Sequence, residues 1–281
     1  MRSVDISQHT SIPEVLLEAQ KAGGEVEKAI EFYRQTPNGS YEFKVYKHAK
    51  IREELNEIFY GKCAYCETRF IHIHPVDIEH YRPKGGFKSA RDTELVKPGY
   101  YWLAADRNNL LPSCIDCNRE RSHPLEDNKV QKFGKGNIFP ITNESTRARS
   151  HDDDLDAEKP LLLHPYFDNP NDHLDFTIDG IVRAKTQGGI ESSKGLTSIE
   201  VYGLQRPYLI KERQKLCLSI FAQISRVKLL LEKIEEYPQD KDFITSFELE
   251  LKLLLDFTKP CSPYSLMARQ IIKGFKLELG I

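Results

Sequence analysis

Two pairs of cysteines share a spacing that suits a metal ion. The pairs are Cys63-Ala-Tyr-Cys66 and Cys114-Ile-Asp-Cys117, and residues 67–113 separate them. Each C-x-x-C pair can form a turn that directs two thiolates at one ion, so together they predict a tetrahedral four-cysteine zinc site. Because sulfur would fill every position, this Zn²⁺ would be structural and would hold the long intervening segment in place.

The cysteines also admit other interpretations. A single C-x-x-C pair is typical of redox sites and arises by coincidence, but two pairs in a chain without a secretion signal favour a metal. The other two cysteines, Cys217 on an apolar helical stripe and Cys261 beside a proline, are expected to be buried or idle thiols.

More residues that could do chemistry lie between and beside the pairs. The segment Asp77-Ile-Glu-His-Tyr-Arg-Pro-Lys84 lies between them, Asn108-Asn-Leu-Leu-Pro-Ser113 leads into the second pair, and Asn118 follows it. Histidine can deprotonate water near neutral pH, and carboxylate and amide oxygens are ligands that hard divalent cations prefer. These are the groups that hydrolysis of a phosphodiester requires.

Taken together, these residues resemble the HNH (ββα-metal) endonuclease pattern across residues 61–140. In that pattern an acidic residue and a histidine precede a turn, and an asparagine precedes a C-x-x-C-[Asn/His] turn. The resemblance implies that His80 is the general base, that Asn109 orients its ring, and that Glu79 and Asn118 bind a catalytic Mg²⁺ or Mn²⁺. Many members of the family carry Asp in place of Glu79, which leaves the metal preference open.

Motifs outside this core extend the resemblance to the HNH nucleases of Septu and retron-linked anti-phage systems. They are Gly61-Lys-Cys-Ala-Tyr-Cys-Glu67, Glu79-His-Tyr-Arg-Pro-Lys84, Tyr101-Trp-Leu103, Pro160-Leu-Leu-Leu-His-Pro165 and Gly203-Leu-Gln-Arg206. Gln205 stands where that pattern has Asn. The wider resemblance implies a nuclease effector that acts on nucleic acid, with DNA the expected substrate, and that works with a partner ATPase.

Basic side chains around the motif are candidates for contacts with phosphates. The net charge of the chain is −2, so any nucleic-acid surface must be local. The candidates are Arg82, Lys84, Lys88, Arg119 and Arg121. The alternative is an ordinary solvated surface of mixed charge, since acidic residues lie among them.

Two functions of other classes compete with a nuclease. A zinc nucleobase deaminase needs a His-x-Glu motif and a Pro-Cys-x-x-Cys motif, but the first is absent here and Ser113 separates Pro112 from Cys114. A non-catalytic zinc module that binds nucleic acid or protein would explain the cysteines. It would leave Glu79, His80 and Asn118 without a role.

The surrounding elements are expected to be mainly helical. Apolar periodicity predicts two short helices within 11–35, a third from about Tyr41 to Tyr60, and three near the C-terminus. Those three are a helix from Arg206 to Pro238, one around Phe243 to Phe257 and one around Ser265 to Leu279. A β-hairpin is expected at Phe176 to Ala184, with a type I′ turn at Asp179-Gly180.

The predicted fold is therefore α+β, with a small zinc-bound ββα-metal core among helices. Three segments are expected to form one compact unit: N-terminal helices at 1–60, the nuclease core at 61–140, and 141–281. The last begins with an acidic surface loop or linker from Thr142 to Pro160. No apolar run is long enough to cross a bilayer and Met1 to Thr10 do not resemble a signal peptide, so we expect a cytoplasmic protein without membrane contact.

Overall fold

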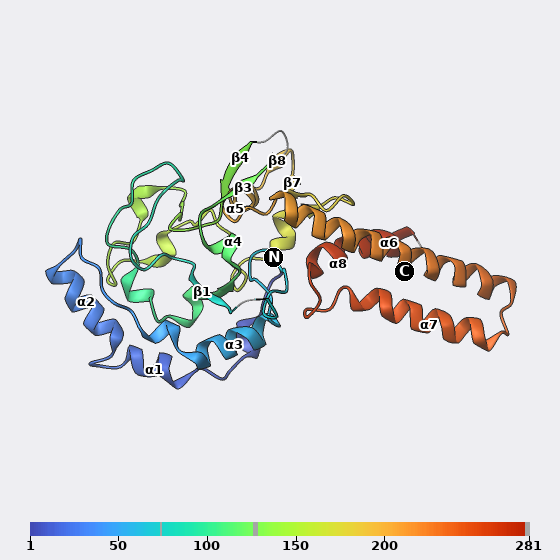
Figure 1. Cartoon of the computed structure of the whole chain (residues 1–281), viewed down its shortest axis with the longest axis horizontal. Helices are drawn as coiled ribbons and strands as arrows, with labels where there is room; N and C mark the ends of the chain where they lie inside the picture. The colour runs from blue at the N-terminus through green and yellow to red at the C-terminus, as the bar shows by residue number, and fades with distance from the viewer. Residues whose placement is uncertain (74, 126–128, 279–281) are drawn as a thin grey trace.

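The computed structural model describes residues 1–73, 75–125 and 129–278. Helices occupy both ends of the chain, and short strands and loops lie between them (Figure 1). The strands pair into small two-stranded antiparallel sheets. This mixture of helices and small sheets confirms the α+β class. No helix in the described ranges has the length and apolarity needed to cross a membrane.

The first two N-terminal helices lie where the apolar periodicity predicts them. They are α1 (Glu14–Gln20) and α2 (Glu25–Gln35), separated by a turn at Gly23, whose φ of 75° favours glycine. Tyr33 of α2 is buried and stacks on Tyr101 with ring centroids 4.6 Å apart. The N-terminal helices therefore pack directly against the central segment.

The third helix is shorter than predicted. It was expected from about Tyr41, but α3 spans only Ala49–Phe59, because His48 is extended and its ring caps the backbone N–H of Lys50. Upstream, the carboxylate of Glu25 accepts the backbone N–H groups of residues 44 and 45. These bonds keep the segment before α3 out of the α-helical conformation, and it forms only a short 3-10 turn at Val45–Lys47.

The central segment forms a ββα arrangement. Strand β1 (Asp77–His80) pairs antiparallel with β2 (Leu110–Ser113), and the single turn of helix α4 (Ile115–Asn118) follows β2 directly. A second small sheet joins β3 (Arg121–Pro124) to β4 (Val130–Phe133).

The acidic segment is more ordered than a flexible linker. Its residues 152–154 are exposed, as expected, but Arg147 and Glu158 are buried. The carboxylate of Glu158 accepts hydrogen bonds from Arg82, the hydroxyl of Tyr100 and the backbone of Ala148. The expectation of a mere surface loop is therefore wrong for its two ends, because buried charges there bind the core.

The predicted hairpin is present as β5 (Leu174–Phe176) and β6 (Val182–Ala184). Its turn is not type I′, because Gly180 has a positive φ of 74° and Asp179 does not. The sequence patterns did not reveal the small hairpin β7 (Thr186–Gln187) and β8 (Ile190–Glu191) or the helix α5 (Ser193–Val201) that follows it.

Three helices complete the chain close to the predicted bounds. They are α6 (Pro207–Glu236), α7 (Lys241–Asp256) and α8 (Ser265–Glu278), and the predicted end at Leu279 lies outside the described residues. The first turns of α6 join the main apolar core, which combines residues of all three expected segments. From Ile220 onward the three helices share a separate apolar cluster, and α6 and α7 project from the body as a hairpin (Figure 1).

Candidate active site

The cysteine pairs converge as their spacing predicts. The four Sγ atoms lie within 4.8 Å of one another, all four residues are buried, and the sulfurs of Cys66 and Cys114 are 3.8 Å apart. Zinc–sulfur bonds of about 2.3 Å in a tetrahedron place the sulfurs about 3.8 Å apart. The cluster therefore fits a zinc ion. The backbone N–H of Ala64 donates to Pro112 in β2, which ties the first pair to the ββα segment.

Arg206, at the start of α6, covers this cluster. Its Nη1 lies 3.4 Å from the sulfur of Cys117, and its Nη2 lies 3.6 Å from that of Cys66 and 3.7 Å from that of Cys114. Four thiolates around a divalent cation leave a net negative charge, which a buried guanidinium offsets. Arg206 ends the sequence motif Gly203-Leu-Gln-Arg206, but the motif alone did not predict a role for it at the cysteine cluster.

The histidine at the end of β1 has a fixed ring. His80 is 5% exposed, and its Nε2 donates to the carbonyl oxygen of Ala104 at 3.0 Å. A carbonyl can only accept, so Nε2 carries the proton and Nδ1 is left as the basic atom. Burial, followed by the nearby charge of Lys84, holds the pKa of His80 well below its usual range. The ring is therefore neutral at pH 7, as a general base must be.

Asn109 supports this geometry through the main chain. Its Nδ2 donates to the carbonyls of Arg82 and Leu103, and its Oδ1 accepts the backbone N–H of Arg82 at 2.7 Å. The hydrogen bonds found for Asn109 in the described chain do not include the ring of His80. The prediction that Asn109 orients the ring thus needs correction, because its side chain instead holds the backbone of Arg82 and Leu103.

A buried lysine that the sequence interpretation missed lies beside Glu79. The Nζ of Lys135 donates to Glu79 Oε1 at 2.7 Å and to the carbonyl of His80 at 3.0 Å. Burial raises the pKa of Glu79, and the charge of Lys135 opposes that effect. Lys135 stands between Gly134 and Gly136, both at positive φ, and a Cβ at Gly134 would lie 2.0 Å from a backbone oxygen. In the sequence, the Gly134-Lys135-Gly136 triplet is the feature that could have pointed to this lysine.

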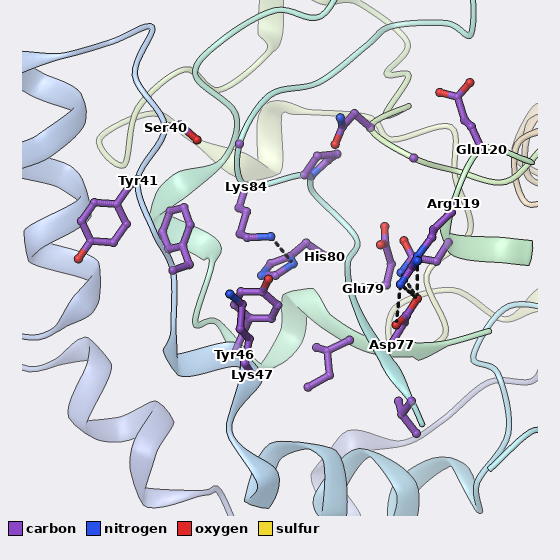
Figure 2. A pocket seen from close by; sticks show the side chains of 18 of the residues that line it. Ser40, Tyr41, Tyr46, Lys47, Asp77, Glu79, His80, Lys84, Arg119 and Glu120 are labelled. Carbon is purple, nitrogen blue, oxygen red and sulfur yellow. Dashed lines mark hydrogen bonds and ion pairs between the residues drawn. The ribbon is translucent and has the colours of Figure 1, made fainter. Parts of the chain in front are cut away.

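Glu79, His80 and Asn118 line one cavity, with a volume of about 760 Å³. Figure 2 shows His80 and Lys84 near its centre, and Glu79 on the same side as Asp77 and Arg119. Asn118 donates its side-chain N–H to Asp77 at 3.4 Å, a bond that does not use its amide oxygen. Carboxylate and amide oxygens on one wall fit a hard divalent cation that keeps several waters.

The predicted phosphate contacts divide into two groups. Lys84 and Arg119 line the cavity, where the guanidinium of Arg119 forms an ion pair with Asp77 at 3.1 Å. The side chains of the others are engaged elsewhere: Arg82 with Glu158, Lys88 with a backbone carbonyl, and Arg121 with Asp116. Lys47 and Arg52 also line the cavity and were missed, because they come from a part of the chain remote from the motif.

Lys84 lies next to His80, the candidate general base. Its Nζ is 3.5 Å from Nδ1 of His80 and 4.4 Å from the centre of the Tyr46 ring. Burial lowers the pKa of Lys84 to about 8. A cation beside the basic nitrogen is well placed to hold a phosphate oxygen there.

Comparison with known proteins gives a consistent family. No protein-family model matches the chain. Septu protein PtuB of Bacillus mycoides (strain KBAB4) is 36% identical over 256 residues, which cover 86% of this chain and 80% of that protein. Septu protein PtuA of the same strain is 30% identical over 163 residues, covering 58% of this chain and 20% of PtuA. With more than a third of the residues shared along four fifths of the relative, this chain belongs to the family of the Septu protein PtuB.

Proposed function

We propose that this protein is a metal-dependent HNH endonuclease and the nuclease effector of a Septu anti-phage system. The observation that carries the proposal is the state of His80: a neutral ring fixed through Nε2, with basic Nδ1 in a cavity that Glu79 and Asn118 also line. Strand β1 supplies Glu79 and His80, helix α4 supplies Asn118, and β2 lies between them in the chain, which is the order of a ββα-metal core. Membership of the PtuB family supports the defence role.

The side chains suit phosphodiester hydrolysis. Nδ1 of His80 takes the proton of the attacking water, and the Ala104 carbonyl stabilises the charged ring that results. Lys84 and Arg119 bind phosphate oxygens at the cavity. Glu79 and Asn118 are the residues that would hold Mg²⁺ or Mn²⁺, which when bound supplies charge compensation at the leaving oxygen.

The cysteine cluster serves structure in this account. Four sulfurs complete the coordination of zinc and leave no open position for water, so the ion anchors the ββα segment without reacting. Loss of the zinc would free the turn at Cys114 that joins β2 to α4, between Asn109, just before β2, and Asn118, at the end of α4.

The partner we propose is an ATPase, and the expected substrate is DNA within the cytoplasm. The hairpin of α6 and α7 supports a docking role, because it projects from the body and exposes apolar side chains such as Leu218, Leu229 and Leu249. Co-expression with a candidate partner ATPase tests the partnership. Co-elution that is lost in a Leu218→Glu/Leu229→Glu variant supports it, and failure of the wild-type proteins to co-elute contradicts it.

The enzymatic proposal is tested with zinc-loaded protein, alone and together with the candidate partner ATPase. Plasmid DNA, linear duplex DNA, single-stranded DNA and RNA are incubated with Mg²⁺, with Mn²⁺ or with neither. We expect cleavage only with a divalent cation, and its loss in Glu79→Gln. The absence of cleavage from every substrate and metal, in protein that retains zinc, would instead favour a non-catalytic zinc module.

A further inference from the structure

One wall of the active-site cavity is aromatic. Residues 40–47, which connect α2 to α3 and end in a short 3-10 turn, bring Tyr41, Phe43 and Tyr46 to the cavity. Figure 2 shows Tyr41 across His80 and Lys84 from Asp77 and Arg119, and Tyr46 next to the His80 ring. The cavity thus has aromatic rings on one side and the proposed metal ligands on the other.

The rings form a path that leads away from the proposed base. Tyr46 packs edge-on against His80 with ring centroids 4.7 Å apart, and farther out Tyr41 packs edge-on against Phe43 at 4.9 Å. Phe43 is buried and belongs to the core, whereas Tyr41 and Tyr46 keep part of their surface exposed. The exposed ring surface at the cavity therefore comes from the two tyrosines.

Cations accompany these rings. The Nζ of Lys84 lies 4.4 Å from the Tyr46 ring centre, and that of Lys47 lies 5.6 Å from it. Arg52, exposed on α3, lines the same cavity. Aromatic faces for bases beside cations for the backbone are the combination by which proteins bind single-stranded nucleic acid.

The depth of the site also favours a single strand over a duplex as the substrate. His80 is 5% exposed and Glu79 is 7% exposed, so the scissile phosphate must enter the cavity to reach them. A cavity of about 760 Å³ has the size that encloses one compact ligand, such as a nucleotide with its neighbouring phosphate. A strand that enters alone has unpaired bases, and those bases need a surface on which to stack.

We infer that the substrate is an unpaired strand of nucleic acid, with a base beside the scissile phosphate stacked on Tyr41 at the mouth of this cavity. This inference rests on the proposed nuclease function and adds the class of substrate to it. Stacking tolerates every base, so the contact selects strandedness rather than sequence.

The test measures binding separately from cleavage. Zinc-loaded protein with Ca²⁺ in place of Mg²⁺ is titrated into fluorescein-labelled 20-nucleotide DNA, RNA of the same sequence, and the DNA duplex, and anisotropy gives each Kd. We expect the single strands to bind more tightly than the duplex. Tyr41→Ala should weaken single-strand binding about 5- to 150-fold, Tyr41→Phe should retain it, and duplex binding should not change in either variant.

Tyr208→Ala is the matched control, because Tyr208 is 63% exposed on α6 and does not line the cavity. Equal single-strand affinity in Tyr41→Ala and wild type, equal loss in Tyr208→Ala, or tighter binding of the duplex would overturn the inference. The comparison of the DNA and RNA strands identifies which one the site prefers. Cleavage with Mg²⁺ that is equally fast on duplex and single strand would refute the inference and leave the nuclease intact, whereas stacking without cleavage would refute the nuclease alone.

Discussion

Lys135 Nζ and Glu79 Oε1 form a buried ion pair 2.7 Å long at the proposed catalytic metal site. The lysine is fully buried and the glutamate is 7% exposed. Replacing Lys135 with Met leaves an uncompensated buried carboxylate, so we expect a loss of about 3–5 kcal/mol in the free energy of unfolding. Urea denaturation measures it.

The double variant Lys135→Met/Glu79→Gln is the control for that prediction, because it removes both charges. It should recover part of the lost stability. Mg²⁺ should also stabilise Lys135→Met more than wild type, since a cation can replace the missing ammonium beside Glu79. A Lys135→Met protein as stable as wild type and indifferent to Mg²⁺ would show that the pair has no such role.

Zinc content tests the cysteine cluster. Wild-type protein should contain about one zinc per chain, and Cys114→Ser should contain less than half an equivalent and lose its cooperative unfolding transition, because the ligand site forms only in the folded chain. Elemental analysis and thermal denaturation provide the readouts. Cys261→Ser, at an exposed cysteine, is the control and should keep both properties. Full stability of a zinc-free Cys114→Ser protein would contradict a structural site.

Arg206 should slow the release of zinc. Its guanidinium approaches three of the sulfurs, so Arg206→Met should transfer zinc to a colorimetric chelator about 10- to 100-fold faster than wild type. Arg226→Met, at a half-exposed arginine of the same helix, serves as the control. Equal release rates in the Arg206→Met and wild-type proteins would mean that the guanidinium only fills space.

Stability should fall in mild acid because of His164. This ring is buried, its Nε2 donates to the carbonyl of Asn108 at 3.0 Å, and burial lowers its pKa to about 3. The unfolded chain binds a proton there near pH 6.5 and the folded chain does not. Stability at this group is therefore complete above pH 6.5 and is lost as the pH falls toward 3, by about 1.4 kcal/mol per pH unit.

A comparison with His164→Gln isolates that contribution. Gln carries no titrating proton, so the variant should be less stable at pH 7.5 but should lose less stability between pH 6.5 and 5.5. Urea midpoints at a fixed zinc concentration measure both slopes. Parallel slopes would assign the acid sensitivity to other groups, such as His80, which both proteins retain.

The parts that the sequence predicted are those whose signal is local. The long apolar period from Leu216 to Ile234 specified α6, and the paired spacing of the cysteines specified their convergence. Residues 41–48 follow a helical pattern too, but the carboxylate of Glu25, from a different helix, accepts the backbone N–H groups of residues 44 and 45. In this segment a tertiary contact therefore overrides the helix propensity of the local sequence.

The parts that escaped prediction depend on distant partners. Lys135 lies 56 positions from Glu79 in the sequence, and Arg206 lies 89 positions from Cys117. The residues around Lys135 and Arg206 in the sequence do not indicate which distant side chain each one contacts. Asn109 illustrates a subtler limit. The motif placed it at the site, but only the structure shows that it binds the backbone of Arg82 and Leu103 rather than the ring of His80.

The central claim, that Nδ1 of His80 is the base for hydrolysis, is tested most directly by cleavage rates of His80→Ala and Asn118→Ala across a range of Mg²⁺ and Mn²⁺ concentrations. We expect His80→Ala to lose about 10²- to 10⁴-fold in rate at every metal concentration, with its zinc content unchanged. Asn118→Ala should regain part of its activity at high metal, because it lacks a ligand and not the base. Wild-type cleavage rates in zinc-loaded His80→Ala protein would contradict the account.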